Sequence, residues 1–406
     1  MLRQLWEYSG GDIEKFDYSP YSRDLARAFS PDGKRFAVSI NSTLKIYDAE
    51  SLQLLAQEVE YGPGQPYTAR TSQIIWSPDG SRILADDNSG GVYLYDSSTC
   101  EFLKIWYANW EFNELTENIS AIVVTPDWRL FAKNDNEGYG QGVLIAGETG
   151  RIGGVYDLST LEKLYNIPDF AMTVSRDWRW YTYTFSYDGS KLYIFSLDEL
   201  MVLDAQTGAP IDSMPYTGLG GMALSPDGAR LAFYAKTDKT VPSLFVINPD
   251  TATELWHADA PIERGTNTRI LWSPDGTLIA VHNEDMEKTV VYDADSGEVV
   301  LEADGDSPSF SPDSAYLLLR RAVISRATSI NTGTDITYEG VMIDIGSGFI
   351  MARLPAPGIF SPDGQTVLMQ DAVWPVKTLA QLIDDARRVL GGRQLTREER
   401  RQYYLD

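Results

Sequence analysis

A short motif that returns eight times, with four short apolar runs around each return, predicts an all-β fold, an eight-bladed β-propeller. The motif is Ser-Pro-Asp-Gly after an apolar or aromatic residue, as in residues 29–33. Successive serine or threonine positions lie 38 to 61 residues apart, and a repeat of this period is typical of propellers. Five full copies lie at 30–33, 77–80, 225–228, 273–276 and 361–364, and looser copies lie at 125–128, 186–189 and 311–314.

The motif predicts a tight turn between two strands. Proline presets one φ angle, aspartate can bond the backbone two residues further on, and glycine accepts the positive φ that closes the turn. In the second repeat, residues 73–76 (Gln-Ile-Ile-Trp) lead into the turn and residues 82–85 (Arg-Ile-Leu-Ala) lead out of it. The motif therefore joins the first and second strands of each repeat.

Two further strands are expected in each repeat, joined by a polar turn that starts at an aspartate. In the first seven repeats the third strand ends in an aromatic or aliphatic residue followed by Asp, except in the fifth repeat, which has Asn248. Because this aspartate occurs about once per repeat, we interpret it as a turn-bonding structural residue. Four short strands without room for helices describe one propeller blade. The aspartates are Asp48, Asp96, Asp157, Asp204, Asp293 and Asp344.

With these motifs, residues 1–376 resemble the WD40-like and TolB-like β-propellers. The chain has Tyr-Asp, as at residues 47–48, where many WD40 repeats have Trp-Asp, and no Gly-His dipeptide opens a repeat. The resemblance implies a propeller fold, whereas function depends on sites rather than on the fold.

The two ends of the repeat region are predicted to pair with each other. Residues 2–8 do not begin a repeat and look like a fourth strand, while the last repeat supplies three strands, ending near residues 372–376. The N-terminal strand would complete the last blade and close the ring, which removes exposed sheet edges. Eight motifs then give eight blades, with seven blades as the alternative. Residues 175–178 also resemble the motif, but 186–189 lie at the usual distance before Asp204.

Two blades carry insertions. In the third blade, the residues between Ala132 and Gly154 are expected to form an extended hairpin between the second and third strands. In the seventh blade, the insertion runs from about Ala322 to Thr337. In a ring of eight blades, these two insertions would lie across the central channel from each other.

Residues 377–406 are predicted to form a short α-helical tail, separate from the propeller domain at 1–376. Thr378 can cap a helix whose apolar residues follow helical spacing, and residues 396–399 (Thr-Arg-Glu-Glu) form a capping-box pattern. Residues 395–403 resemble the ends of bacterial WD40-repeat proteins, which are often sensor or adaptor modules near signalling enzymes. The tail is expected to pack over the closed blade, with partner docking as the alternative.

The composition narrows the range of functions and locations that we expect for the protein. The net charge of −24 and the pI near 4.4 argue against binding to nucleic acid phosphates or to an anionic membrane surface. The single cysteine fits a reducing compartment, and neither a signal peptide nor an apolar run of membrane-spanning length is recognisable. We therefore expect a cytoplasmic protein.

The residues suited to catalysis are few. His257 and His282 are the two histidines, and we interpret both as ordinary sheet residues. Cys100 is expected in a turn, without a nearby base, and no zinc-binding or phosphate-binding motif is present. Residues 86–87 (Asp-Asp) and 283–285 (Asn-Glu-Asp) are the better candidates for metal ligands, although solvated loop acids are the simpler interpretation. We predict no enzyme activity and no cofactor.

The long connections point to a binding surface. They all join the second strand to the third, or one blade to the next, so they lie on one face of a propeller. Aromatic and arginine side chains on that face are favoured as interface anchors. The candidate residues are Tyr107, Trp110, Phe112, Tyr139, Trp178, Arg320, Arg321 and Arg326.

The sequence thus predicts a non-catalytic protein-interaction scaffold or sensor module. Its partner would be a protein, for example a signalling or effector enzyme, that docks between aromatic residues on one side and a basic patch on the other. The alternatives are a metal-dependent channel enzyme of the lactonase-like kind and a TolB-like accessory factor.

Overall fold

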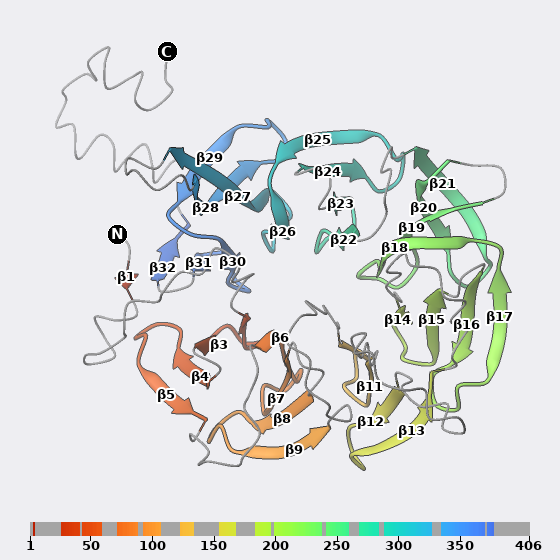
Figure 1. The fold of residues 1–406 in the computed structure, drawn as a ribbon, viewed down its shortest axis with the longest axis horizontal. Helices are drawn as coiled ribbons and strands as arrows, with labels where there is room; N and C mark the ends of the chain where they lie inside the picture. Colours follow the sequence, from red (N-terminus) through yellow and green to blue (C-terminus); the bar gives the residue numbers. More distant parts are fainter. Residues whose placement is uncertain are drawn as a thin grey trace.

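The structure, a computed structural model, consists of eight four-stranded antiparallel sheets arranged in a ring (Figure 1). The predicted eight-bladed all-β propeller is therefore confirmed. No helix long and apolar enough to span a lipid bilayer occurs in the part of the chain that the structure describes. The described residues are 3–4, 26–40, 43–58, 71–87, 92–106, 122–133, 154–167, 183–195, 199–237, 241–259, 268–283, 288–326, 334–369 and 372–376. The predicted helical tail at 377–406 lies outside them.

The first four blades follow one another along the chain, and each sheet has its strands in chain order. Blade 1 contains β2 (Arg27–Phe29), β3 (Arg35–Ile40), β4 (Thr43–Asp48) and β5 (Leu54–Gln57). Blade 2 contains β6 (Thr71–Trp76), β7 (Arg82–Asp87), β8 (Val92–Asp96) and β9 (Phe102–Trp106). Blade 3 contains β10 (Val123–Val124), β11 (Leu130–Lys133), β12 (Gly154–Asp157) and β13 (Glu162–Asn166). Blade 4 contains β14 (Tyr183–Phe185), β15 (Lys191–Phe195), β16 (Leu200–Asp204) and β17 (Pro210–Met214).

The other four blades complete the ring. Blade 5 contains β18 (Thr217–Leu224), β19 (Leu231–Lys236), β20 (Ser243–Asn248) and β21 (Thr253–Asp259). Blade 6 contains β22 (Thr268–Trp272), β23 (Leu278–Asn283), β24 (Lys288–Asp293) and β25 (Val299–Asp304). Blade 7 contains β26 (Asp306–Phe310), β27 (Tyr316–Arg326), β28 (Thr334–Asp344) and β29 (Ile350–Leu354). Blade 8 contains β30 (Gly358–Phe360), β31 (Thr366–Met369), β32 (Ala372–Pro375) and, from the N-terminal region, β1 (Arg3–Gln4).

The ring closes as the sequence predicts. Arg3 pairs with Val373 and Gln4 with Ala372, so β1 is the fourth strand of the last blade. Side-chain packing also joins the first blade to the last, because one hydrophobic cluster contains Phe36 and Leu52 of blade 1 and Leu368 of blade 8. Seven comparable clusters lie at the other blade-to-blade interfaces, so the apolar core is a ring of eight clusters.

The connections divide between two faces of the ring. In each blade the first strand lies innermost and the fourth outermost (Figure 1). Because neighbouring strands are antiparallel, the turns between strands one and two and between strands three and four lie on the same face, here called the turn face. The connections between strands two and three, and those from blade to blade, lie on the opposite face, here called the loop face.

The eight motif turns share one hydrogen-bond pattern. In each, the buried Ser or Thr hydroxyl donates to the Asp Oδ1 at 2.5–2.6 Å. Each aspartate also accepts the N–H two residues further on, as predicted. These bonds stabilise the charged carboxylate, and the Ser77 and Ser186 hydroxyls in particular help to lower the pKa of Asp79 and Asp188 to about 2.

The last position of the motif turn has a positive φ in all eight blades, including the looser copies. Six blades have glycine there, whereas Trp128 and Ser314 take φ angles of 57° and 60° without being glycine. The looser copies are therefore the same turn, which in two of them is formed with a non-glycine residue that rarely adopts this conformation.

The aspartates that follow the third strands also have the predicted turn-bonding role. Asp48 accepts the N–H of Ser51 at 2.7 Å, and Asp293 accepts that of Ser296 at 2.8 Å. Asn248 does the same in blade 5, with the N–H of Thr251 at 3.0 Å. Asn248 therefore preserves the structure of the turn, although it stands where the six other blades with this turn have Asp.

Two blade interfaces also contain a stacked Arg–Trp pair. Arg35 lies over the Trp76 ring at 5.0 Å and donates to the Gly80 carbonyl of the next blade at 2.6 Å. Arg230 lies over Trp272 at 5.0 Å and donates to the Gly276 carbonyl at 2.6 Å. Each pair links the motif turn of one blade to that of the next, and the two pairs are four blades apart.

Candidate protein-binding face

The loop face carries a hairpin that extends beyond its blade. Strands β27 and β28 pair continuously from Tyr316↔Asp344 to Arg326↔Thr334. Their neighbours in the sheet stop earlier, because β26 pairs no further than Arg320 and β29 no further than Gly340. Residues 321–326 and 334–339 therefore form a two-stranded extension, here called the ribbon. The predicted insertion in blade 7 is thus partly regular β-structure.

The first ion pair at the base of the ribbon is bidentate. The Arg320 guanidinium donates to both carboxylate oxygens of Asp306, at 2.6 and 2.9 Å. The same guanidinium lies 4.8 Å from the centre of the Tyr338 ring. Arg320 is therefore fixed on two sides, by a fork-shaped ion pair and by a cation–π contact.

A second group of charges joins the ribbon to the outer strand of blade 7. Glu339 accepts hydrogen bonds from Arg321 and, at 2.8 Å, from Arg353 of β29. The Glu339 side chain is largely buried, which strengthens ion pairs relative to exposed ones. Acidic neighbours thus offset the charges of Arg320 and Arg321, which the sequence suggested as parts of a basic patch.

The remaining candidates on this face are less fully placed. Arg326 lies at the described end of β27, where the ribbon pairs it with Thr334. The aromatic candidates Tyr107, Trp110, Phe112, Tyr139 and Trp178 lie outside the described residues, as does the predicted hairpin in blade 3. Asp306, Tyr338 and Glu339 were not among the residues predicted from the sequence. Residues 334–338, with β-branched and aromatic types, were a signal that strand structure continues into the insertion.

The possible catalytic groups have structural partners. His257 lies in β21, where its Nδ1 is 2.7 Å from Glu254, and His282 lies in β23, where its Nδ1 is 2.9 Å from the Lys288 carbonyl. His282 is buried within β23, in agreement with its interpretation as a sheet residue. Burial raises the pKa of the Cys100 thiol to about 12, so this cysteine remains protonated at neutral pH and is a poor nucleophile.

The candidate metal ligands are also placed differently from the prediction. Asp86 and Asp87 are the last two residues of β7 rather than the start of a loop, because Asp86 pairs with β6 and β8 and Asp87 pairs with β6. Asn283 likewise ends β23. In the described residues, no three His, Cys, Asp or Glu side chains come close enough together to hold a metal ion.

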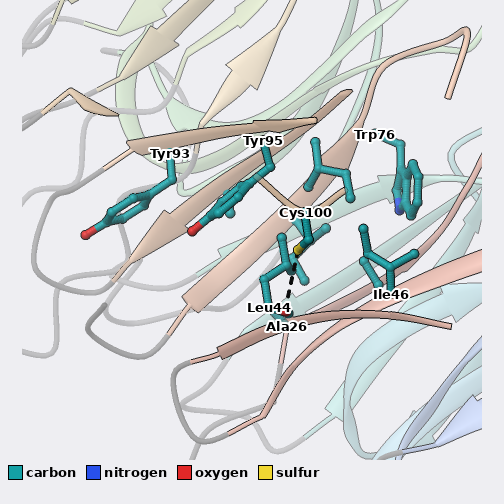
Figure 2. Close-up of a cluster of buried hydrophobic side chains, with 11 residues drawn as sticks. Ala26, Leu44, Ile46, Trp76, Tyr93, Tyr95 and Cys100 are labelled. Carbon is teal, nitrogen blue, oxygen red and sulfur yellow. Dashed lines mark hydrogen bonds between the residues drawn. The ribbon is translucent and has the colours of Figure 1, made fainter. Parts of the chain in front are cut away.

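A buried polar group lies between blades 1 and 2, beside the apolar cluster that Figure 2 shows. Glu58 accepts hydrogen bonds from the Tyr95 hydroxyl at 3.1 Å and from the Leu44 N–H at 3.3 Å. The Cys100 thiol is 3.6 Å from the Leu44 carbonyl (Figure 2). Burial raises the pKa of Glu58, although the two hydrogen bonds act in the opposite direction.

The fold is similar to that of a solved WD40 domain. The C-terminal WD40 domain of Sif2 is similar with a TM-score of 0.59 at 10% sequence identity, covering 87% of this chain and 96% of that domain. The β-propeller domain of Cps50 (Swd1) from Myceliophteria thermophila gives a TM-score of 0.48 at 14% identity, over 77% of this chain and 95% of that domain. No protein-family model matches the chain, and no curated protein matches it in sequence.

Proposed function

We propose that this WD40-like propeller is a non-catalytic scaffold or sensor module that binds a protein partner on its loop face. The observation that carries the proposal is the ribbon of blade 7, which projects beyond the sheet and is anchored at its base by ion pairs. We further propose a cytoplasmic location, in line with the acidic composition and the single buried cysteine.

The ribbon offers backbone groups to a partner. Within the described residues, no strand pairs with the outer side of 321–326 or of 334–339. Unpaired strand edges are templates for an added strand, and many peptide-binding proteins use them in this way. An isolated two-stranded ribbon is only marginally stable in water, so the ion pairs of Arg320 and Arg321 help to hold the binding element in place.

The proposed binding face includes residues beyond the ribbon. Arg326 lies on the ribbon itself, and the insertion of blade 3 comes from the blade four positions away. Aromatic residues on the neighbouring connections would supply the anchors of the interface, since aromatic side chains dominate many hot spots. These proposed anchors are Tyr107, Trp110, Phe112, Tyr139 and Trp178.

Shortening both insertions tests the proposal. Residues 323–337 would be replaced by Asn-Gly, which closes a two-residue hairpin after the Ala322–Tyr338 pair, and residues 134–153 would be shortened likewise. Once a partner has been captured from the native host and purified, its affinity for the variant should fall by well over about tenfold, the loss of one or two hot spots. Thermal unfolding should change little, because these connections lie outside the blade sheets.

A turn-face variant serves as the control. Tyr187 is 59% exposed on the opposite face, so Tyr187→Ala should leave binding of this partner unchanged. Undiminished binding by the shortened variant would contradict the proposal. The competing channel-enzyme hypothesis would be favoured by stoichiometric metal in protein purified without chelators, together with a hydrolase activity that needs the metal.

A further inference from the structure

The turn between β28 and β29 presents an aromatic side chain that the repeat does not require. Phe349 is 73% exposed, and it lies five residues after the turn aspartate Asp344. The six other blades with this turn have a polar residue or alanine at that position. The equivalent residues are Gln53, Glu101, Glu162, Ala209, Thr253 and Glu298. Since these blades form the same turn without an aromatic residue, the packing of the blade does not explain Phe349.

Aliphatic side chains on the rims of blades 6 and 7 accompany Phe349. Val299 and Val300 at the start of β25 are 51% and 44% exposed, and Ile350 is 44% exposed. The turn that holds Phe349 approaches β25, because a Cβ at Gly348 would be 3.8 Å from the Leu301 side chain. Val299, Val300, Phe349 and Ile350 are here called the rim patch. A large apolar patch bordered by polar residues is typical of an interaction site.

The turns that surround the rim patch are acidic. In blades 6, 7 and 8, the described turns of the turn face contain seven acids and neither Lys nor Arg. The corresponding turns of blades 1 to 5 contain Lys34, Arg129 and Arg230, and three further cations, Arg35, Arg82 and Lys191, follow as the first residues of second strands. The turns of blades 6 to 8 thus differ from the others in lacking cations of their own, and the Arg230 side chain of blade 5 pairs with only one of their acids, Asp295. The seven acids are Asp275, Asp293, Asp295, Glu298, Asp313, Asp344 and Asp363.

The acids remain available to a partner even where they bond their own turn. Asp344 accepts from the N–H and the hydroxyl of Ser347 through Oδ1, and Asp293 accepts from Ser296 through the same atom. Asp295 pairs with Arg230, yet its side chain is 91% exposed. The sector is thus an apolar centre within a negatively charged border.

We infer that the rim patch and its acidic border form a second docking surface, for a basic protein segment that carries apolar anchor residues. Phe349 would be the central anchor, because a few residues, often aromatic, carry most of the binding energy at many interfaces. Lysine and arginine of the segment would lie over the acidic border, which favours encounter and suppresses acidic competitors. A second copy of this chain is a poor occupant, since acids would face acids.

This surface is independent of the proposed function. The rim patch lies on the turn face, whereas the ribbon lies on the loop face, so a variant of one surface leaves the other intact. If protein partners occupied both surfaces at the same time, the propeller would act as an adaptor between two proteins.

Selection of short peptides from a random library against the whole chain tests the inference. Wild-type protein, Phe349→Ala and Leu103→Ala would be compared. Leu103→Ala is the matched control, because Leu103 is an apolar residue, 46% exposed, on the outer strand of blade 2. Peptides that bind wild type and fail on Phe349→Ala should be enriched in Lys or Arg together with aromatic or aliphatic residues.

The affinity of these peptides should fall at least about tenfold on Phe349→Ala and stay within about twofold on Leu103→Ala. Glu298→Lys should also weaken binding, and added salt should reduce the difference between wild type and this charge-reversed variant. Thermal unfolding of each variant verifies that the exposed substitution leaves the fold intact.

Three outcomes would overturn the inference. The selected peptides could lack basic residues, or they could bind Phe349→Ala as well as they bind wild type. Self-association in sedimentation that disappears in Phe349→Ala would assign the rim patch to a second copy of the chain instead.

Discussion

Buried and partly buried polar side chains in this propeller bond across blade interfaces as well as within turns. Gln73 of blade 2 exchanges hydrogen bonds with the backbone of Ile122 in blade 3, at 2.9 and 3.2 Å. Glu58 of blade 1 bonds Tyr95 of blade 2. An amide keeps both hydrogen-bonding functions at any pH, whereas a buried carboxyl depends on its protonation state. The interface between blades 1 and 2 should therefore respond to pH.

Glu58→Gln should gain stability over wild type as the pH rises. The pKa of Glu58 is raised by burial above the ordinary value of 4.5, so its protonated form is favoured in the folded protein. This contribution is fully present below the unfolded pKa and is lost as the pH rises through the folded pKa. The free energy of unfolding from urea titrations, measured between pH 4.5 and pH 8, would show the difference between the two proteins growing with pH.

Glu101→Gln is the control for this measurement, because Glu101 is an exposed glutamate in the turn that also contains Cys100. Its difference from wild type should stay nearly constant over the same range. A constant difference for Glu58→Gln as well would show that Glu58 does not couple the folding of this interface to pH.

At the scale of strands and turns, neighbouring blades are joined by contacts between side chains far apart in sequence. Arg35 bonds the turn at Gly80 and also reaches Ser97, whose hydroxyl is 3.2 Å away. Arg230 reaches the Ala294 carbonyl at 3.1 Å in the equivalent turn of blade 6. The tryptophan indoles complete each contact, since Trp76 donates to Ala28 and Trp272 to Ala223.

Arg230→Met should destabilise the protein by about 2 kcal/mol, because it removes hydrogen bonds to three acceptors and the cation–π contact with Trp272. Arg82→Met is the matched control. Arg82 has the same position in its motif, but the next blade has Val124 where Trp272 would be. Urea unfolding should place Arg82→Met within about 0.5 kcal/mol of wild type. Equal losses for the two variants would mean that the stacked pair adds nothing specific.

The turns were predictable from the sequence, but the contacts between blades were not. Ser-Pro-Asp-Gly specifies its own hydrogen bonds within five residues, so local chemistry was sufficient for the eight turns. Arg35 and Trp76 are 41 positions apart, and their contact depends on how two blades pack. The long β27–β28 register was hidden for a related reason, because Arg321 and Glu339 become partners only when these two strands align. Phe349 is exceptional only once its exposure is known, because the sequence gives its place in the turn but not its burial.

At the scale of the whole molecule, features recur four blades apart. The Arg–Trp pairs join blades 1 and 2 and blades 5 and 6. The sequence insertions fall in blades 3 and 7, as do the two motif turns without glycine, at Trp128 and Ser314. The ring therefore combines an eightfold repeat with a weaker twofold one, in which stabilised interfaces alternate with blades that carry insertions.

Removal of residues 1–8 should destabilise the entire ring rather than blade 8 alone. The deletion removes β1 and exposes the edge of β32. Differential scanning calorimetry should show one transition, lowered by roughly 5 °C or more, since the blades share their cores with both neighbours. An unchanged transition would contradict closure by β1. A separate early transition would show that blade 8 unfolds independently.

The direction of pairing at the closure also determines how the ring would respond to mechanical force. Because Arg3 lies opposite Val373 and Gln4 opposite Ala372, the chain leaves this pairing at the same end in both directions, towards residue 1 and towards residue 376. Tension between two proteins attached to the chain ends would load the paired residues one after another, as in unzipping, rather than all at once in shear. Forced opening of a pairing is governed by its rate of unfolding. Hydrogen bonds that break one after another resist less force than hydrogen bonds that must break together. A pull on the termini would therefore open the ring at its closure first, while the seven other sheets remain folded.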